Sequence, residues 1–192
     1  MTLLDDFTEE SARTSVADHI GTWWLVYCSP RDEQRIVDQL NGLLNIPAFW
    51  PRETVIRTEI DRSGHRHRHP FKRSLFPGVL MFCVSGDSQM WAIEENRFIN
   101  RQNIRPIKNQ RRFIKEITAL ESALAFDPGL KLLDKLQVGK RCRVKAGHVM
   151  EGTEGFLIDT DDKRVRFTIQ VTTLNQSVAV EIDPVFLEPS DW

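Results

Sequence analysis

The chain has 192 residues, of which 41% are hydrophobic and 28% are charged, a composition typical of a soluble globular protein with one domain or two small ones. No apolar run approaches the roughly 20 residues that a membrane-spanning helix needs, so we expect no membrane partner. Residues 1–18 hold five acids and one base, unlike a secretory signal, and we expect an acidic disordered tail over residues 1–21 of a cytoplasmic protein.

The next hundred residues predict an α+β domain. Residues 22–28 are aromatic and β-branched, which indicates a strand, and residues 31–44 carry apolar side chains at helical spacing. The other expected elements are two strands joined by a polar loop, a short helix, an irregular strand and a longer helix, over residues 48–58, 75–84, 89–95, 98–107 and 110–125. This order predicts an antiparallel sheet with helices packed against it, over residues 22–125.

A second, smaller domain is expected after a linker. Asp127-Pro-Gly129 interrupts the helical pattern, and residues 126–136 form the expected linker. Beyond it, short alternating stretches separated by turn residues are typical of a small all-β barrel over residues 137–189. Its expected strands cover residues 141–146, 153–159, 164–171 and 177–182.

Charge is distributed unevenly between the two parts. Residues 21–125 hold 16 Lys and Arg against 11 Asp and Glu, whereas residues 137–192 hold 7 against 9. A partner that carries phosphates is therefore expected to meet the first part. The three cysteines are widely spaced in apolar stretches, which favours small buried hydrophobic residues over a disulfide or a metal site.

Two short motifs are informative. Leu75-Phe-Pro-Gly78 ends the basic loop and opens an apolar strand. In the C-terminal third, a strand, turn and strand pattern contains three glycines that we expect to adopt positive φ, at positions 147, 152 and 155. With Trp23-Trp24 upstream, the order of these motifs resembles the NusG family of transcription elongation factors, over residues 22–189. The resemblance implies an NGN-like N-terminal domain followed by an SH3-like KOW barrel.

The resemblance also implies a protein-binding surface. In that family the N-terminal domain docks on the clamp helices of RNA polymerase through an apolar patch, and the matching positions are Trp24, Leu75, Phe76, Pro77 and Val79. The family usually has a tyrosine where this chain has Val79, so the aromatic surface is expected to be smaller. The alternative is that Trp24 and Phe76 are ordinary core aromatics.

The loop at residues 61–73 holds five Lys or Arg and three His against one acid. Three interpretations are open: a zinc site, a solvated basic loop, and a loop that contacts phosphates. Zinc is the least favoured because a fourth ligand at suitable spacing is missing, and no metal is expected. In NusG relatives the matching hairpin lies near upstream nucleic acid, which favours phosphate contacts by Arg66, Arg68, Lys72 and Arg73.

Two further arginines, Arg31 and Arg35, lie four residues apart at the start of the first helix and share one helix face. The resemblance implies that this face touches the non-template DNA strand, as in specialised antiterminators. The alternative is ordinary surface charge, offset by Asp32 and Asp38.

The sequence therefore predicts a transcription elongation or antitermination factor that binds RNA polymerase, suppresses pausing or termination, and recruits a ribosomal protein or a termination factor through its barrel. The acidic tail, the Val79 position and the His-Arg loop favour a specialised antiterminator of the RfaH or UpxY type. The alternative is an RNA-binding or ribosome-associated KOW protein. No enzyme motif and no cofactor site is found, so no catalytic activity is expected.

Overall fold

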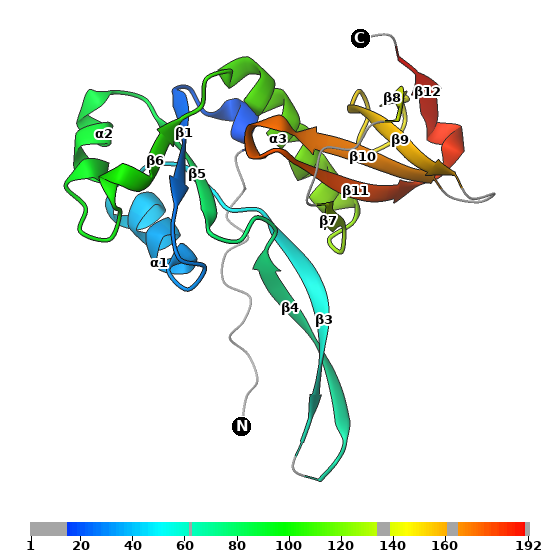
Figure 1. Cartoon of the computed structure of the whole chain (residues 1–192), viewed down its shortest axis with the longest axis horizontal. Coiled ribbons are helices and arrows are strands. Elements are labelled where there is room, and N and C mark those ends of the chain that lie inside the picture. The colour runs from blue at the N-terminus through cyan, green and yellow to red at the C-terminus, as the bar shows by residue number, and fades with distance from the viewer. Residues whose placement is uncertain (1–14, 62, 134–138, 161–164, 191–192) are drawn as a thin grey trace.

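The structure is a computed structural model that describes residues 15–61, 63–133, 139–160 and 165–190. It contains an α+β domain, an all-β domain and a long β-hairpin that projects from the first (Figure 1). The predicted fold class is therefore confirmed. The predicted tail lies outside the described residues as far as position 14.

The α+β domain is built on a four-stranded antiparallel sheet in the order β2-β5-β1-β6. The strands are β1 (Thr22–Tyr27), β2 (Ala48–Phe49), β5 (Val79–Val84) and β6 (Ile104–Pro106). Successive side chains of a strand point to opposite faces. Both faces of the sheet are covered by helices, which explains why β1 and β5 are apolar almost throughout.

The two faces pack against different helices. Val26, Leu80 and Phe82 point toward α1 (Glu33–Asp38), the π-helical turn η2 (Gln39–Leu43) and α2 (Asp87–Glu94). Trp23 points to the opposite face, where its ring lies 5.8 Å from that of Phe113 on α3 (Gln110–Phe126). The helices lie close to the predicted ranges. Their apolar stripes are visible in the sequence because these side chains cover the two faces of the sheet.

The predicted polar loop is the largest correction to the sequence analysis. Residues 66–74 form strand β4, which pairs antiparallel with β3 (Arg52–Ile60) through nine consecutive residue pairs. Apolar residues do not alternate along β4 because neither face of this hairpin is buried for most of its length. Cross-strand hydrogen bonding maintains the ladder instead.

The motif Leu75-Phe-Pro-Gly78 forms a tight turn, and β5 begins only at Val79. The Val79 amide donates to the Phe76 carbonyl over 3.0 Å, and Gly78 has φ +80°, as expected after Pro77 in a type II turn. A Cβ on Gly78 would lie 2.7 Å from the Cys28 carbonyl oxygen, so glycine is required here for two reasons. The buried Glu33 carboxylate accepts from the Gly78 amide and fixes the turn over the start of α1.

The all-β domain is a six-stranded antiparallel sheet in the order β12-β8-β9-β10-β11-β7. The four predicted strands are present as β8 (Lys140–Val144), β9 (Glu154–Thr160), β10 (Val165–Val171) and β11 (Gln176–Ile182). Two short edge strands were not predicted. These are β12 (Leu187–Pro189) and β7 (Lys131–Leu133), and β7 lies within the predicted linker and pairs with β11.

The glycines of this domain serve two purposes. Gly147 and Gly152 have φ +86° and +77°, as predicted. Gly155 does not have positive φ, which corrects the third expectation. A Cβ there would lie 2.3 Å from the Thr168 carbonyl oxygen and 2.6 Å from the Phe167 ring, so close backbone approach requires this glycine.

Short 3₁₀ turns complete the fold: η1 (Val16–Asp18), η3 (Arg101–Asn103), η4 (Thr172–Leu174) and η5 (Pro184–Phe186). The first corrects the predicted tail at its C-terminal end. Val16 is buried, and its amide and the Ser15 hydroxyl donate to Glu121 on α3. In the part of the chain that the structure describes, no helix is long and apolar enough to cross a membrane.

Candidate protein and nucleic-acid interfaces

The five predicted polymerase contacts do not form one surface. Leu75 and Phe76 are each 1% exposed and belong to the core, so the expectation that they offer an apolar surface is corrected. Their burial follows from the turn, which directs both side chains under the sheet before the chain reverses at Pro77. Trp24 is half-buried on the face covered by α1 and α2, whereas Val79 packs on the opposite face. Of the other three, Pro77 is exposed, and Trp24 and Val79 are each partly exposed.

Sequence reasoning missed Tyr27, which the structure places beside Val79. Tyr27 and Val79 are cross-strand partners on β1 and β5, and the tyrosine is 42% exposed. Alternation along the strand could have indicated it. Tyr27 lies on the same face of β1 as Trp23, at the end of the strand, and Val79 comes directly after the turn. We call Tyr27, Pro77 and Val79 the Tyr27 surface. It replaces the predicted patch as the apolar surface at this end of the sheet.

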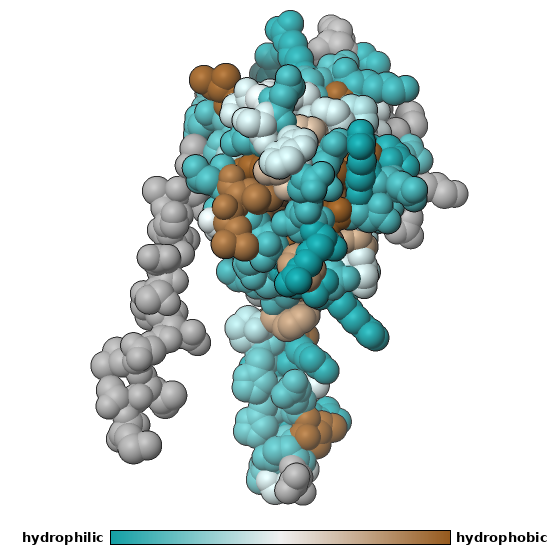
Figure 2. Space-filling view, turned by 90° about the vertical axis from the view of Figure 1, so that its left-hand side faces the viewer, coloured by the Kyte–Doolittle hydropathy of each residue, from teal (hydrophilic) through white to brown (hydrophobic). Residues whose placement is uncertain are grey.

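The β3–β4 hairpin carries different chemistry on its two faces. Paired residues of antiparallel strands share a face. One face holds Thr54, Ile56, Thr58 and Ile60 opposite Lys72, Pro70, Arg68 and Arg66, respectively. It has three cations and no acid. We call it the basic face. In the space-filling view the hairpin is mostly hydrophilic with an apolar spot near its tip, where Ile60 is 65% exposed (Figure 2).

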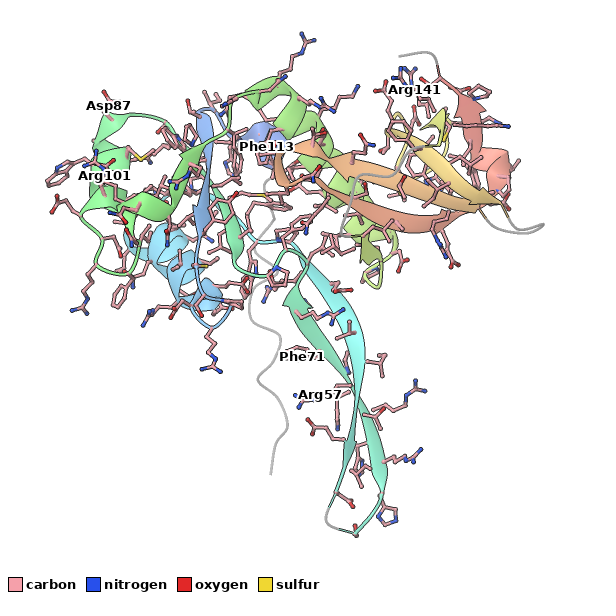
Figure 3. All side chains as sticks on the ribbon, viewed as in Figure 1. Arg57, Phe71, Asp87, Arg101, Phe113 and Arg141 are labelled. Carbon is pink, nitrogen blue, oxygen red and sulfur yellow. The ribbon has the colours of Figure 1, made fainter. Side chains whose placement is uncertain are left out.

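The opposite face of the hairpin is balanced in charge, and we call it the paired face. Arg73 donates to Glu53 over 2.7 Å, and Arg57 lies 3.6 Å from Glu59. Arg57 and Phe71 stand on this face well away from the rest of the molecule (Figure 3). Arg73 is thus separated from the other three predicted phosphate contacts by the thickness of the hairpin. Its charge is neutralised by a carboxylate that is 9% exposed.

The hairpin tip is held by Asp61. Its carboxylate accepts from the Ser63 hydroxyl over 2.7 Å, from the His67 ring over 3.1 Å, and from the His65 amide over 2.9 Å. These bonds, led by the one from Ser63, lower the pKa of Asp61 to about 2. His67 also stacks on His69 at a centroid distance of 6.1 Å. The three histidines therefore have roles within the tip and on the paired face.

The start of α1 gathers more positive charge than the sequence analysis expected. Arg35 pairs with Asp32 over 2.8 Å, and its guanidinium also lies 4.5 Å from the centroid of the Phe98 ring. Arg97 lies 4.6 Å from the same ring. Arg97 and Phe98 follow α2 in the sequence, so only the tertiary fold brings them to Arg35. Arg31 is exposed but precedes α1, whose N-cap is Asp32, so the expectation that it shares a helix face with Arg35 is corrected.

The two domains meet along α3. A cleft of about 940 Å³ runs between this helix and strands β9 and β10. Glu154 on β9 forms ion pairs with Lys115 of the helix and Arg143 of β8. Glu116 of the helix accepts a hydrogen bond from the Thr172 amide over 2.9 Å. The acids of the cleft are therefore matched by neighbouring donors, and we regard it as a structural contact between the domains.

Metal and thiol chemistry have little support in this geometry. Within residues 15–61, 63–133, 139–160 and 165–190, no three His, Cys, Asp or Glu side chains are grouped as a metal site would require. The cysteines are free, and burial raises the pKa of Cys28 and of Cys142 to about 11. A thiol with a raised pKa is a weak nucleophile at neutral pH.

Comparisons with known proteins found similarity among solved structures. No protein-family model and no curated protein matches the chain. Among solved structures, the chain is similar to one described as "Domain interaction in Thermotoga maritima NusG", with 13% sequence identity and a TM-score of 0.43. The match covers 88% of this chain and 97% of that chain. A likeness of this degree assigns no role to any residue, so the functional argument rests on the residues and surfaces described above.

Proposed function

We propose that this protein is a non-catalytic transcription elongation factor that binds RNA polymerase through its α+β domain and suppresses pausing or termination. The observation that carries the proposal is the order of Trp23-Trp24, Leu75-Phe-Pro-Gly78 and the glycines of the β8–β9 turn, in a chain that folds as an α+β domain followed by an all-β domain. The proposed domain limits are residues 22–125 and 137–189.

The proposed polymerase contact is the Tyr27 surface. Tyr27 offers an exposed ring at the end of β1, and the rigid turn at Pro77 holds Val79 beside it. Aromatic side chains on a rigid framework are common anchors of protein interfaces. An apolar surface of this kind suits the side of a helical hairpin, and the proposed partner is the clamp helices.

Nucleic acid of the elongation complex is the second proposed partner. Arg35 and Arg97 lie on the Phe98 ring, and Arg31 is exposed just before α1, so cations and an aromatic ring occur together at this end of the helix. Proteins that bind single strands use such a combination. We propose that this group contacts the non-template strand. The all-β domain is proposed to recruit a ribosomal protein or a termination factor.

The proposed mechanism is a shift in equilibrium. A factor that binds the elongating state of polymerase more tightly than the paused state increases the population of the first. A tenfold shift needs a difference in binding free energy of about 1.4 kcal/mol. Contacts of one aromatic anchor and a few cations are sufficient to supply that difference.

The test is a reconstituted transcription assay with polymerase of the same organism. The full-length protein should shorten pauses or increase read-through of a terminator. The Tyr27→Ala variant should lose most of the effect, because an exposed anchor is removed without loss of core packing. A Trp91→Ala variant is the matched control, since Trp91 is 66% exposed on α2, outside the Tyr27 surface.

Three outcomes bear on the proposal. No effect of the wild-type protein on pausing or termination would contradict it. Tight binding to RNA without any affinity for polymerase would favour the alternative, an RNA-binding or ribosome-associated protein. An effect that depends on one sequence in the transcribed template would identify a specialised antiterminator, whereas equal activity on all templates would identify a general factor.

A further inference from the structure

We infer that the outer edge of strand β3 pairs with the same strand of a second copy of this chain, which gives a two-fold symmetric dimer. The two β3 strands run antiparallel and are centred on Thr58, so the two hairpins join into one four-stranded sheet. The inference goes beyond the proposed function and does not rest on it, because it concerns the association of the protein with itself.

The first argument is that β3 has backbone groups without partners. The groups of successive residues along an antiparallel strand point alternately toward and away from the neighbouring strand. The Asp61 amide donates to the His65 carbonyl over 3.0 Å, so the groups of Asp61 point inward. Those of Ile60, Thr58 and Ile56 therefore point away from β4. Among the residues that the structure describes, none forms a hydrogen bond with these outward groups.

The same edge already binds a backbone group at its base. Thr54 has the outward orientation of Ile56, and its amide donates to the Pro128 carbonyl over 2.6 Å. Beyond this point the hairpin projects away from both domains (Figure 1), so another strand can approach it. An unpaired strand edge of this kind is a template for pairing with another chain.

The second argument is that only one edge of the hairpin is open. Pro70 on β4 lies opposite Ile56, at a position where an amide would point outward, and proline has no amide hydrogen to offer. Strand β4 also carries four cations and no acid, so two copies of it would repel each other. Proline and like charges are devices that protect a strand edge. Between Ile56 and Ile60, β3 has neither.

The third argument is that β3 is complementary to itself. In an antiparallel pair centred on Thr58, Ile56 lies opposite Ile60 of the second copy on the basic face, and Arg57 lies opposite Glu59 on the paired face. Two-fold symmetry produces each contact twice. The isoleucines are 57% and 65% exposed in the single chain and cover each other in the pair. Apolar and oppositely charged cross-strand pairs both stabilise a sheet.

The side chains also select this register. Moving the centre by one residue places Arg57 opposite its own copy or Glu59 opposite its own copy, and like charges directly opposite each other are destabilising. The cations of the two β4 strands do not prevent pairing. Arg68 and its copy are three strand spacings apart, about 14 Å, which exceeds the distance over which salt screens exposed charges.

The interface is small. A pair of strands with about five residues each buries less than the roughly 1,200 Å² of a stable interface, so we expect a reversible dimer that forms as concentration rises. Sedimentation equilibrium of the full-length protein between about 10 µM and about 1 mM covers the range in which weak interfaces associate. The apparent mass should rise from one chain toward two.

The backbone contact is tested by Thr58→Pro, which removes an outward amide donor and should keep the protein monomeric throughout this range. The matched control is Thr58→Val, which retains the amide and should dimerise as the wild type does. Because the groups of Thr58 point away from β4, the hairpin itself should survive the proline. Protection of the Glu59 and His67 amides from hydrogen exchange measures this.

The charge contact is tested by Arg57→Glu and Glu59→Arg. Each variant alone places like charges opposite each other and should be monomeric, whereas an equimolar mixture should form a dimer with one copy of each. The contact of Arg57 with Glu59 within one strand, at 3.6 Å, does not explain such a result, because both variants lose it and mixing does not restore it.

Three results would each overturn the inference. They are a wild-type protein that stays monomeric up to about 1 mM, a folded Thr58→Pro variant that associates as the wild type does, and a mixture of the two charge variants that stays monomeric. The first would leave the edge of β3 to a strand of a different protein. The proposed function is judged separately by the transcription assay, and its result does not depend on this dimer.

Discussion

Helix α3 and the β3–β4 hairpin are two elements of similar size in sequence with opposite relations to the rest of the molecule. The helix packs on both sides. Phe113 contacts the sheet through Trp23, and Lys115 and Glu116 bond to the all-β domain. Among the residues that the structure describes, the hairpin beyond its base is hydrogen-bonded only within itself. At the base, the Thr54 amide donates to the Pro128 carbonyl over 2.6 Å. The difference separates an element that maintains the fold from an ordered element that is available to bind.

The largest effect that tests this comparison is on stability. Phe113→Ala should lower the free energy of unfolding by about 3–5 kcal/mol, because it opens a cavity in a fully buried site. Phe71→Ala, the same substitution on the hairpin, should cost about 1 kcal/mol or less, since that ring is 47% exposed and contributes chiefly a cross-strand contact. Urea unfolding of both variants measures the difference. Equal decreases in the free energy of unfolding for the two variants would show that the hairpin is part of the core.

Glycine substitutions give the second effect. Gly155→Ala should cost about 1–3 kcal/mol, because its Cβ would collide with Thr168 and Phe167. Gly64→Ala, at the hairpin tip, has φ +86° and free space around it, so only backbone strain of about 1 kcal/mol is expected there. Hydrogen exchange should show the first variant opening across β9 and β10 and the second only at the tip. A global effect of Gly64→Ala would contradict the independence of the tip.

The contact between the domains supplies a third, pH-dependent effect. Burial opposes ionisation of Glu154, but the bonds from Lys115 and Arg143 outweigh it and hold its pKa below the usual value. A lowered pKa in the folded state stabilises the protein above the unfolded pKa, and the contribution is lost as pH falls through the folded value. Glu154→Gln should therefore cost about 1 kcal/mol near neutral pH and progressively less below pH 4.5.

Urea unfolding of the wild type and the Glu154→Gln variant at both ends of this pH range measures the effect. A difference that does not shrink on acidification would mean that the carboxylate charge contributes nothing to the contact. Glu59→Gln is the control, because Glu59 lies on the exposed hairpin and pairs with Arg57 at 3.6 Å. Its substitution should change stability very little at either pH.

The smallest effect is local to the hairpin tip. Asp61→Asn should loosen the turn, because the amide accepts weaker bonds from Ser63, His65 and His67 than the carboxylate does. Amide exchange of Ser63 and His65 should accelerate while the free energy of unfolding stays the same. In the wild type the Asp61 carboxyl should titrate near pH 2, and the order of the tip should persist above that pH. Titration near the ordinary value would contradict the bonding described.

Much of the fold could be predicted because burial leaves a pattern in the sequence. The strands β1 and β5 and the helix α3 are apolar where they meet the core, and each was expected within a few residues. Strand β4 of the hairpin could not be predicted, whereas much of β3 was, because the exposed faces of β4 carry no apolar alternation. The strand β7 was missed for a similar reason, as an edge strand of three residues is too short to show a period.

The candidate sites were predicted by residue type more successfully than by position. The basic residues of the loop were recognised, but only strand pairing separates Arg73 from Arg66 and Arg68. Phe76 was expected at the surface because the sequence of the motif Leu75-Phe-Pro-Gly78 does not show that its turn directs the Phe76 ring into the core. Tyr27 and Val79 come together only through the register of two strands that are 52 residues apart in the sequence.

The most direct test of the central claim is the affinity of the full-length protein for core RNA polymerase in the absence of nucleic acid. The account predicts that Tyr27→Ala weakens this binding by about 1 kcal/mol or more, as loss of an interface anchor does, while Trp91→Ala and the hairpin variant Arg66→Gln/Arg68→Gln bind as the wild type does. Absence of binding by the wild-type protein, or an unchanged affinity of a folded Tyr27→Ala variant, would contradict it.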